Sequence, residues 1–181
     1  MNEATVQKMK QMKLYGMHSA YISATETGNI HRMDPDNLLS VLIESEWDEK
    51  MNRRIERNIK NATFHYRAAM EEVIYDENRN LDRSKMEHLS EGIFITKAEN
   101  ILITGPTGTG KSYIATALGY QACIEGIRVK YFNVNKLLSR MKMAKVEGDF
   151  LKELTKLNRF TLLILDDFGL QKLDKEDRVY F

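Results

Sequence analysis

A segment near the middle of the chain has the residue types needed to hold a phosphate group. It satisfies the pattern Gly-x-x-x-x-Gly-Lys-Ser/Thr in full. In such a loop, backbone N–H groups and the start of the following helix bind anionic oxygen atoms. The segment consists of Gly105, Pro106, Thr107, Gly108, Thr109, Gly110, Lys111 and Ser112. We therefore expect it to bind the phosphates of ATP together with Mg²⁺.

Separate roles are predicted for residues at the end of this loop. Lys111 is expected to contact the β- and γ-phosphates as a catalytic residue, and the hydroxyl of Ser112 to bind Mg²⁺. A side chain at Gly110 would collide with the phosphates or with the turn itself. A chance glycine turn is the alternative interpretation. The flanking segments argue against it, because an apolar run precedes the loop and a helical pattern follows it.

Two carboxylates follow a second apolar run, Leu-Leu-Ile-Leu at residues 162–165. Ligands of parallel sheets bind at the carboxyl ends of the strands, so Asp166 is expected beside Ser112, holding Mg²⁺ directly or through water. Asp167 would lie next to the γ-phosphate and polarise an attacking water, as a second catalytic residue. The alternative is a simple turn after a strand, which the phosphate loop upstream makes less attractive.

The elements that must position these residues are predicted from the pattern after Ile95. Strands and helices alternate, which predicts an α/β fold of the P-loop NTPase type, with a parallel sheet flanked by helices. The predicted strands are 100–104, 128–133 and 161–165, and the predicted helices are 112–125, 136–146 and 150–157. The apolar runs 101–103 and 162–165 favour strands that are buried on both faces.

The sequence before Ile95 is rich in charged residues, and its pattern indicates helices. We expect a small all-helical domain over residues 1–95 and a P-loop core over residues 96–181. Asp34 and Pro35 are typical of a helix start. Helices are expected over residues 3–25, 38–62, 66–73 and 83–90.

A basic stretch lies on the predicted helix 38–62 and its continuation. The basic residues are Lys50, Arg53, Arg54, Arg57, Lys60 and Arg67, and the only acid among them is Glu56. Helical spacing places Arg53, Arg57 and Lys60 on one face. With Arg54 they form a candidate ridge for DNA phosphates. A solvated helix face, neutralised by the acid-rich segment 71–91, is the alternative.

Composition excludes several other classes of protein. The 181 residues are 43% hydrophobic with a formal net charge of +1, which is typical of a globular chain and predicts no partner. The single cysteine, Cys123, cannot form an internal disulfide and is expected in the core. The four histidines have no metal-ligand spacing. Since the chain has neither a long apolar run nor a signal peptide, we expect a cytoplasmic protein without membrane contact.

With these residues in view, the chain resembles the IstB-like helper ATPases of bacterial insertion sequences, which are relatives of the DnaC-type helicase loaders in the AAA+ class. The resemblance runs through nearly the whole chain, from Leu14-Tyr15-Gly16-Met17 and Glu46-Trp47 onward. Its most specific part is 100–174, which holds the phosphate loop and the sequence Leu-Leu-Ile-Leu-Asp-Asp-Phe-Gly.

The resemblance implies an ATPase that converts ATP to ADP and phosphate, forms homo-oligomers on double-stranded DNA and recruits the transposase of the same element. It assigns Mg²⁺ to Asp166 and places Asp167 where AAA+ proteins usually have glutamate, so that hydrolysis is expected to be slow. The helical part with the Arg53–Lys60 ridge would contact DNA or transposase. Members of the family continue beyond the position of Phe181 to a sensor residue and an arginine finger, so the ATPase core is expected to be incomplete and its turnover low.

Three other functions stay open at this point. A replicative helicase loader of the DnaC type has the same architecture, and co-purification of a helicase would indicate it. A small-molecule kinase can be built on the same loop, and phosphate transfer to a small acceptor would establish it. A non-catalytic module would keep only ATP, DNA or partner binding, and measurable ATP turnover would exclude it.

Overall fold

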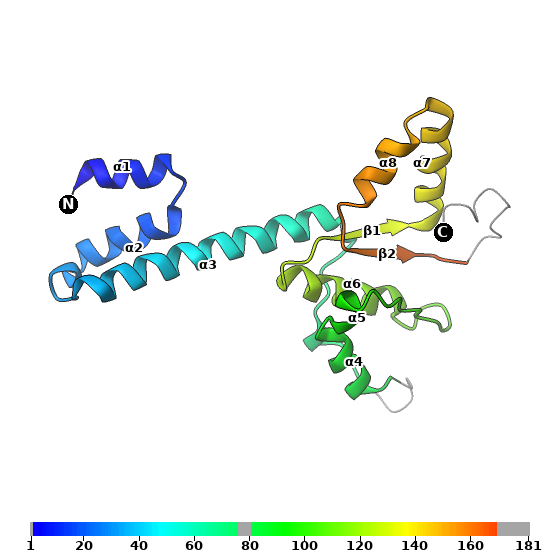
Figure 1. The fold of residues 1–181 in the computed structure, drawn as a ribbon. Helices are drawn as coiled ribbons and strands as arrows, with labels where there is room; N and C mark the ends of the chain where they lie inside the picture. The colour runs from blue at the N-terminus through cyan, green and yellow to red at the C-terminus, as the bar shows by residue number, and fades with distance from the viewer. Residues whose placement is uncertain (1, 76–80, 170–181) are drawn as a thin grey trace. The chain divides into compact units, whose positions relative to one another are not determined.

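The chain forms two compact units, which are described separately. The computed structural model describes residues 2–75 and 81–169 (Figure 1). The first unit ends at Glu56 and the second begins at Arg57, so the division falls within one long helix. Residues 57–95, which have the helical and charged character of the N-terminal part, therefore belong to the second unit.

Helices make up the first unit. They are α1 (Glu3–Gln11), α2 (Tyr15–Glu26), the short 3-10 helix η1 (Asn29–His31) and most of α3 (Pro35–Ala62). The predicted start of α3 is confirmed, because Oδ1 of Asp34 accepts hydrogen bonds from the N–H groups of Asp36 and Asn37 at 3.1 and 3.0 Å. Although α3 has 28 residues, neither it nor any other helix in the described part of the chain has the length and apolar character for a membrane crossing.

The single helix expected over residues 3–25 is wrong, because the chain turns between α1 and α2. The turn brings the start of α2 against α3. There Oε2 of Glu46 accepts hydrogen bonds from the N–H groups of Gly16 and Met17 at 2.9 and 3.2 Å. Glu46 is buried, and it supplies the acceptor that Leu14, the apolar N-cap residue of α2, does not have.

The second unit contains the end of α3 and the elements that follow it. These are η2 (Met70–Glu72), α4 (Arg83–Ser90), α5 (Ile93–Thr96), α6 (Lys111–Ile124), β1 (Val129–Asn133), α7 (Val134–Glu147), α8 (Phe150–Leu157) and β2 (Leu162–Asp166). The predicted helix 83–90 is confirmed, and the elements after the phosphate loop lie close to their predicted bounds. The helix expected over residues 66–73 is wrong, because only the short turn η2 forms there, after the extended residue Ala69.

The strands β1 and β2 form a two-stranded parallel sheet. Val129 pairs with Leu162 at one end, and Asn133 pairs with Asp166 at the other. The chain passes from β1 to β2 through α7 and α8, which lie on one side of the sheet, while α6 lies on the other (Figure 1). This arrangement of helices on a small parallel sheet is consistent with the predicted α/β fold.

The strand expected over residues 100–104 does not form. Among the described residues, β1 and β2 pair only with each other, and no strand is assigned to this segment. Because a strand requires a hydrogen-bonded neighbour, the apolar run remains irregular. Leu102 is 77% exposed and Leu163 of β2 is 39% exposed, so neither run is buried on both faces. The larger sheet predicted for a P-loop protein is therefore not confirmed.

The core of the second unit lies between α6 and the sheet. Its buried cluster consists of Ala62, Ala122, Cys123, Val129, Tyr131 and Ile164. Cys123 is fully buried, as predicted for a small core residue. Gly119 permits the close approach of α6 to β2, since a Cβ at this position would lie 2.4 Å from Cδ1 of Ile164. The beginning of α6 is thereby held near the end of β2.

Candidate nucleotide-binding site

The predicted phosphate loop, Gly105–Ser112, leads directly into α6, which begins at Lys111. Its backbone takes positive φ angles of 83° at Gly108 and 87° at Gly110. Residues with a Cβ rarely adopt this region. No atom lies within 4 Å of a Cβ built at Gly108, so the backbone conformation, and not a lack of space, requires glycine there.

Positive charge and N–H groups converge on this exposed loop. The ammonium of Lys111 donates a hydrogen bond to the carbonyl of Pro106 at 2.7 Å, and the hydroxyl of Thr109 donates to the same oxygen at 2.9 Å. The N-cap residue of α6 is Gly110, which has no side chain to accept from the first N–H groups of the helix. A lysine charge at the positive end of a helix is suited to an anionic ligand.

The carboxylate of Asp166 lies beside the loop, where the sequence placed it. The hydroxyl of Ser112 donates a hydrogen bond to Oδ1 of Asp166 at 2.9 Å. Ser112 is in the first turn of α6, and Asp166 is the last residue of β2. The packing of α6 on the sheet therefore joins the two sequence motifs in one site.

Hydrogen bonds keep Asp166 ionised in its half-buried position. Burial alone would raise the pKa of this carboxyl, but hydrogen bonds from Tyr131, Ser112 and the N–H of Asp167 lower it below its ordinary value. The Tyr131 hydroxyl donates to Oδ2 of Asp166, and the N–H of Asp167 donates to Oδ1 at 3.0 Å. The site thus holds a negative charge next to the hydroxyl of the loop.

Asp167 follows β2 in an unusual backbone conformation. Its φ angle is 60°, in the left-handed region that aspartate tolerates better than most residues. Its side chain is exposed, and Oδ2 accepts a hydrogen bond from Nδ2 of Asn133 at 2.6 Å. Oδ1 of the same Asn133 accepts from the N–H of Lys136 and so caps α7. One amide group therefore connects the start of α7 with the second carboxylate.

The oxygen atoms of Ser112 and Asp166 fit Mg²⁺. This cation prefers oxygen ligands and is usually held by one or two protein groups together with phosphates and water. A hydroxyl and an ionised carboxylate 2.9 Å apart at the end of a phosphate loop supply such a donor set. No group of three or more His, Cys, Asp or Glu side chains in the described part of the chain is arranged to hold a metal, so a cation at Ser112 and Asp166 would need phosphate and water to complete its ligands.

Tyr131 and Asn133 were not predicted from the sequence. Both lie on β1, two residues apart, and both donate to the carboxylates that end β2. The sequence did show that the two residues alternate at the carboxyl end of a predicted strand. Alternate residues of a strand lie on one face, so this spacing could have indicated that both side chains face the site. Pairing of this strand with 161–165 was needed to interpret that signal.

Two of the residues predicted to contact DNA belong to the first unit. Arg53 donates from Nε to Oε1 of Glu49 at 2.7 Å, and its guanidinium lies 4.3 Å from the centroid of the Tyr15 ring. Glu49 lies one residue before the basic stretch, which begins at Lys50, so the ion pair of Arg53 with Glu49 was not predicted. Arg54 is exposed. DNA contact by either arginine stays a prediction.

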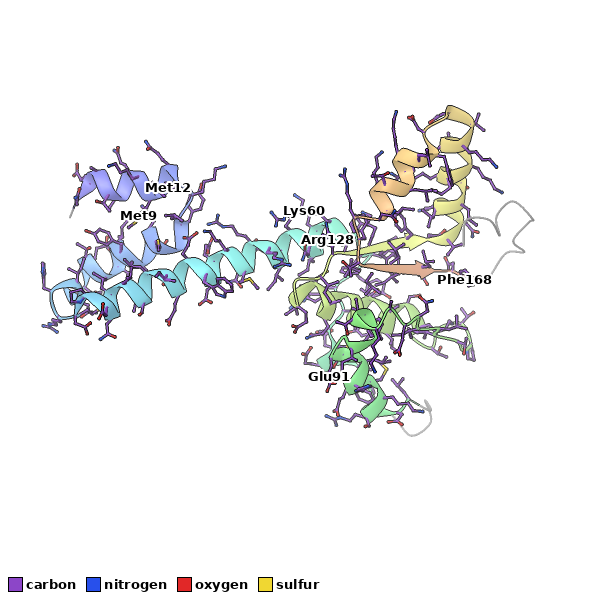
Figure 2. All side chains as sticks on the ribbon, viewed as in Figure 1. Met9, Met12, Lys60, Glu91, Arg128 and Phe168 are labelled. Atoms are coloured by element: carbon purple, nitrogen blue, oxygen red, sulfur yellow. The ribbon has the colours of Figure 1, made fainter. Side chains whose placement is uncertain are left out.

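The other two residues, Arg57 and Lys60, belong to the second unit. Both are exposed, and Lys60 lies near the C-terminal end of α3 (Figure 2). Exposed cations suit phosphate contact and equally suit a solvated helix face. DNA contact by Arg57 and Lys60 therefore stays a prediction.

Comparison with known proteins identifies the family. Residues 7–181 match the family described as IstB-like ATP binding protein. A Sinorhizobium fredii protein named as an insertion sequence ATP-binding protein is 33% identical over 174 residues, which cover 96% of this chain and 71% of that protein. A similarly named Pseudomonas fluorescens protein, from the insertion sequence IS1162, is 34% identical over 98% of this chain and 78% of its own. Since the match covers nearly the whole sequence, this chain belongs to the family of IstB-like ATP binding proteins.

Proposed function

We propose that this protein binds ATP with Mg²⁺ at Gly105–Ser112, hydrolyses it, and acts on DNA as the helper of an insertion-sequence transposase. The observation that carries the proposal is the hydrogen bond between Ser112 and Asp166, because it unites the phosphate loop and the carboxylate pair. Membership of an ATP-binding family supports ATP as the nucleotide. The names of the relatives support a role in an insertion sequence.

The loop residues would bind the phosphates through backbone and side-chain donors. Lys111 would exchange its hydrogen bond to the Pro106 carbonyl for the β- and γ-phosphate oxygens. The N–H groups at the start of α6 would donate to the same phosphates. Ser112 and Asp166 would hold Mg²⁺ directly or through water, and the bound cation would neutralise charge that develops on the transferred phosphate.

Asp167 would orient and polarise the water that attacks the γ-phosphate. Its exposed carboxylate lies next in sequence to the metal-site residue Asp166. Asn133 fixes this carboxylate through a hydrogen bond of 2.6 Å, which leaves other lone pairs for water. An aspartate reaches less far than a glutamate, so we propose slow turnover.

The proposed partners are double-stranded DNA, the transposase of the same element and further copies of this chain. Arg57 and Lys60 support a DNA contact, since both present exposed positive charge on one helix. Replacing both with glutamine is expected to weaken DNA binding for all sequences and to reduce the slope of log K against log salt by about 2. Replacing the exposed Lys8 and Lys10 of α1 is a charge-matched control that is expected to leave the slope unchanged. Equal salt slopes for the Arg57/Lys60 variant and the Lys8/Lys10 variant would contradict DNA contact by Arg57 and Lys60.

ATP hydrolysis by the purified chain, with and without double-stranded DNA, tests the catalytic part of the proposal. We expect slow turnover that DNA stimulates and that Lys111→Ala abolishes. Turnover that is equal in wild type and Lys111→Ala would indicate a contaminating ATPase. Binding of ATP without any turnover would reduce the function to nucleotide binding and leave the helper role without hydrolysis.

A further inference from the structure

Tyr131 of β1 combines a buried ring with a hydroxyl that reaches the candidate metal site. The residue is 4% exposed and packs in the core cluster with Val129 and Ile164. Its hydroxyl donates a hydrogen bond to Oδ2 of Asp166. The proposed function gives this tyrosine no role, although its one polar side-chain atom contacts the proposed Mg²⁺ ligand.

The carboxylate of Asp166 is held through both of its oxygen atoms. Oδ1 accepts from the hydroxyl of Ser112 at 2.9 Å and from the N–H of Asp167 at 3.0 Å, while Oδ2 accepts from Tyr131. Each carboxylate oxygen has two lone pairs, so both positions of Oδ1 are used and one position on Oδ2 remains for a cation or its water. Loss of the tyrosine hydroxyl would remove the donor on Oδ2 and let the carboxylate group rotate.

Packing determines where this hydroxyl lies. The His65 ring meets the Tyr131 ring edge-on, with centroids 5.1 Å apart, and Phe64 makes a second edge contact at 6.3 Å. Tyr131 also pairs in register with Ile164, two residues before Asp166, so the tyrosine and the carboxylate lie on the same face of the sheet. The core therefore fixes the hydroxyl relative to the metal site.

The chemistry of the two groups gives this hydrogen bond its direction. The phenol of Tyr131 supplies one O–H donor, and an ionised carboxylate has acceptor sites alone. The bond therefore runs from phenol to carboxylate and is charge-assisted.

We infer that Tyr131 is a positioning residue whose hydroxyl orients Asp166 toward Mg²⁺ and so lowers the Mg²⁺ concentration at which ATP binds. This inference rests on the proposed ATP and Mg²⁺ site. Outer-shell donors to metal ligands change metal affinity by about 10–100-fold. A purely structural role, in which Asp166 only satisfies a buried phenol, predicts a change in stability without a change in the Mg²⁺ requirement.

Tyr131→Phe in the full chain tests this inference, since it removes the hydroxyl and keeps the packed ring. Binding of a fluorescent ATP analogue is measured across a Mg²⁺ titration and again in EDTA, together with the free energy of unfolding. The matched control is Tyr113→Phe. Tyr113 also donates to a carboxylate, that of Glu72 at 2.7 Å, and lies next to Ser112 without contacting Asp166.

We expect Tyr131→Phe to raise the Mg²⁺ concentration for half-maximal binding by about tenfold, with binding in EDTA unchanged. Tyr113→Phe should match wild type. In an Asp166→Asn background, Tyr131→Phe should cause no further change, because the tyrosine acts through that carboxylate. An unchanged Mg²⁺ requirement in Tyr131→Phe would overturn this inference alone. Failure of wild type to bind the analogue at any Mg²⁺ concentration would overturn the proposed function as well.

Discussion

Replacing Gly108 with alanine tests whether the phosphate loop needs the backbone conformation described here. Gly108 has a φ angle of 83°, and a Cβ at this position meets no atom within 4 Å. The cost of alanine therefore comes from the backbone, and a left-handed conformation costs an L-residue roughly 1–2 kcal/mol. Alanine also reduces the entropy of the unfolded chain, which offsets about 0.4–1 kcal/mol of the loss in unfolding free energy.

Isothermal titration with ATP and Mg²⁺ measures the consequence for binding. A free loop that relaxes to relieve the strain must regain its conformation when phosphate binds. The Kd of Gly108→Ala should then rise by about 5–30-fold, which corresponds to the strain of roughly 1–2 kcal/mol. Gly108→Asn should show a smaller effect, because asparagine tolerates this region.

Gly148→Ala is the matched control for this prediction. Gly148 has a φ angle of 78° and is the C-cap residue of α7. A Cβ built at this position also meets no atom within 4 Å. Alanine there should strain the backbone to a similar degree and leave the Kd for ATP unchanged. A Gly108→Ala protein with wild-type Kd and wild-type unfolding free energy would refute the reasoning.

Three further predictions concern stability and pH. Asn133→Ala should lower the unfolding free energy by about 1 kcal/mol, because α7 loses its cap. Asn133→Asp keeps the cap and should reduce ATP turnover, because the new carboxylate repels Asp167. Equal unfolding free energies of wild type and Asn133→Ala in a urea titration would contradict the first expectation. Glu46→Ala should cost about 1–3 kcal/mol in a urea titration followed by circular dichroism, because N–H groups at the start of α2 lose their acceptor, and Glu46→Gln should cost less. The N–H of Asn37 holds the pKa of Asp34 below its ordinary value. The ionised Asp34 carboxylate therefore stabilises the folded chain above about pH 3.9, and this stabilisation is lost as the pH falls through the lower folded-state pKa. Asp34→Asn should reduce the fall of the melting temperature at acid pH. Parallel curves of melting temperature against pH for wild type and Asp34→Asn would contradict the assignment of this acid dependence to Asp34.

The sequence predicted those features whose causes are local. The start of α3 follows from Asp34 and Pro35, which cap and open a helix without help from distant residues. The phosphate loop is equally local, since its glycines and the following helix are contiguous in sequence. The position of Asp166 beside Ser112 also followed from sequence, through the general rule that ligands gather at the carboxyl ends of parallel strands.

Three features that depend on tertiary neighbours were not predicted. The apolar run 100–104 has strand-like composition, but strand formation depends on a pairing partner that the run itself does not specify. The break before α2 depends on Glu46, far away in sequence, which caps the new helix. The contacts from Tyr131 and Asn133 to the carboxylates required the register of β1 and β2.

ATP binding by wild type and Lys111→Ala, measured by calorimetry with Mg²⁺, tests the central claim most directly. The ammonium of Lys111 lies against the loop at the start of α6, and its charge-assisted hydrogen bond to phosphate should contribute about 1.5–3 kcal/mol. The account predicts saturable binding by wild type at one site per chain, weakened by about 10–150-fold in Lys111→Ala. Equal affinities in the two proteins, or no binding by a folded wild type, would contradict the assignment of Gly105–Ser112 as the nucleotide site.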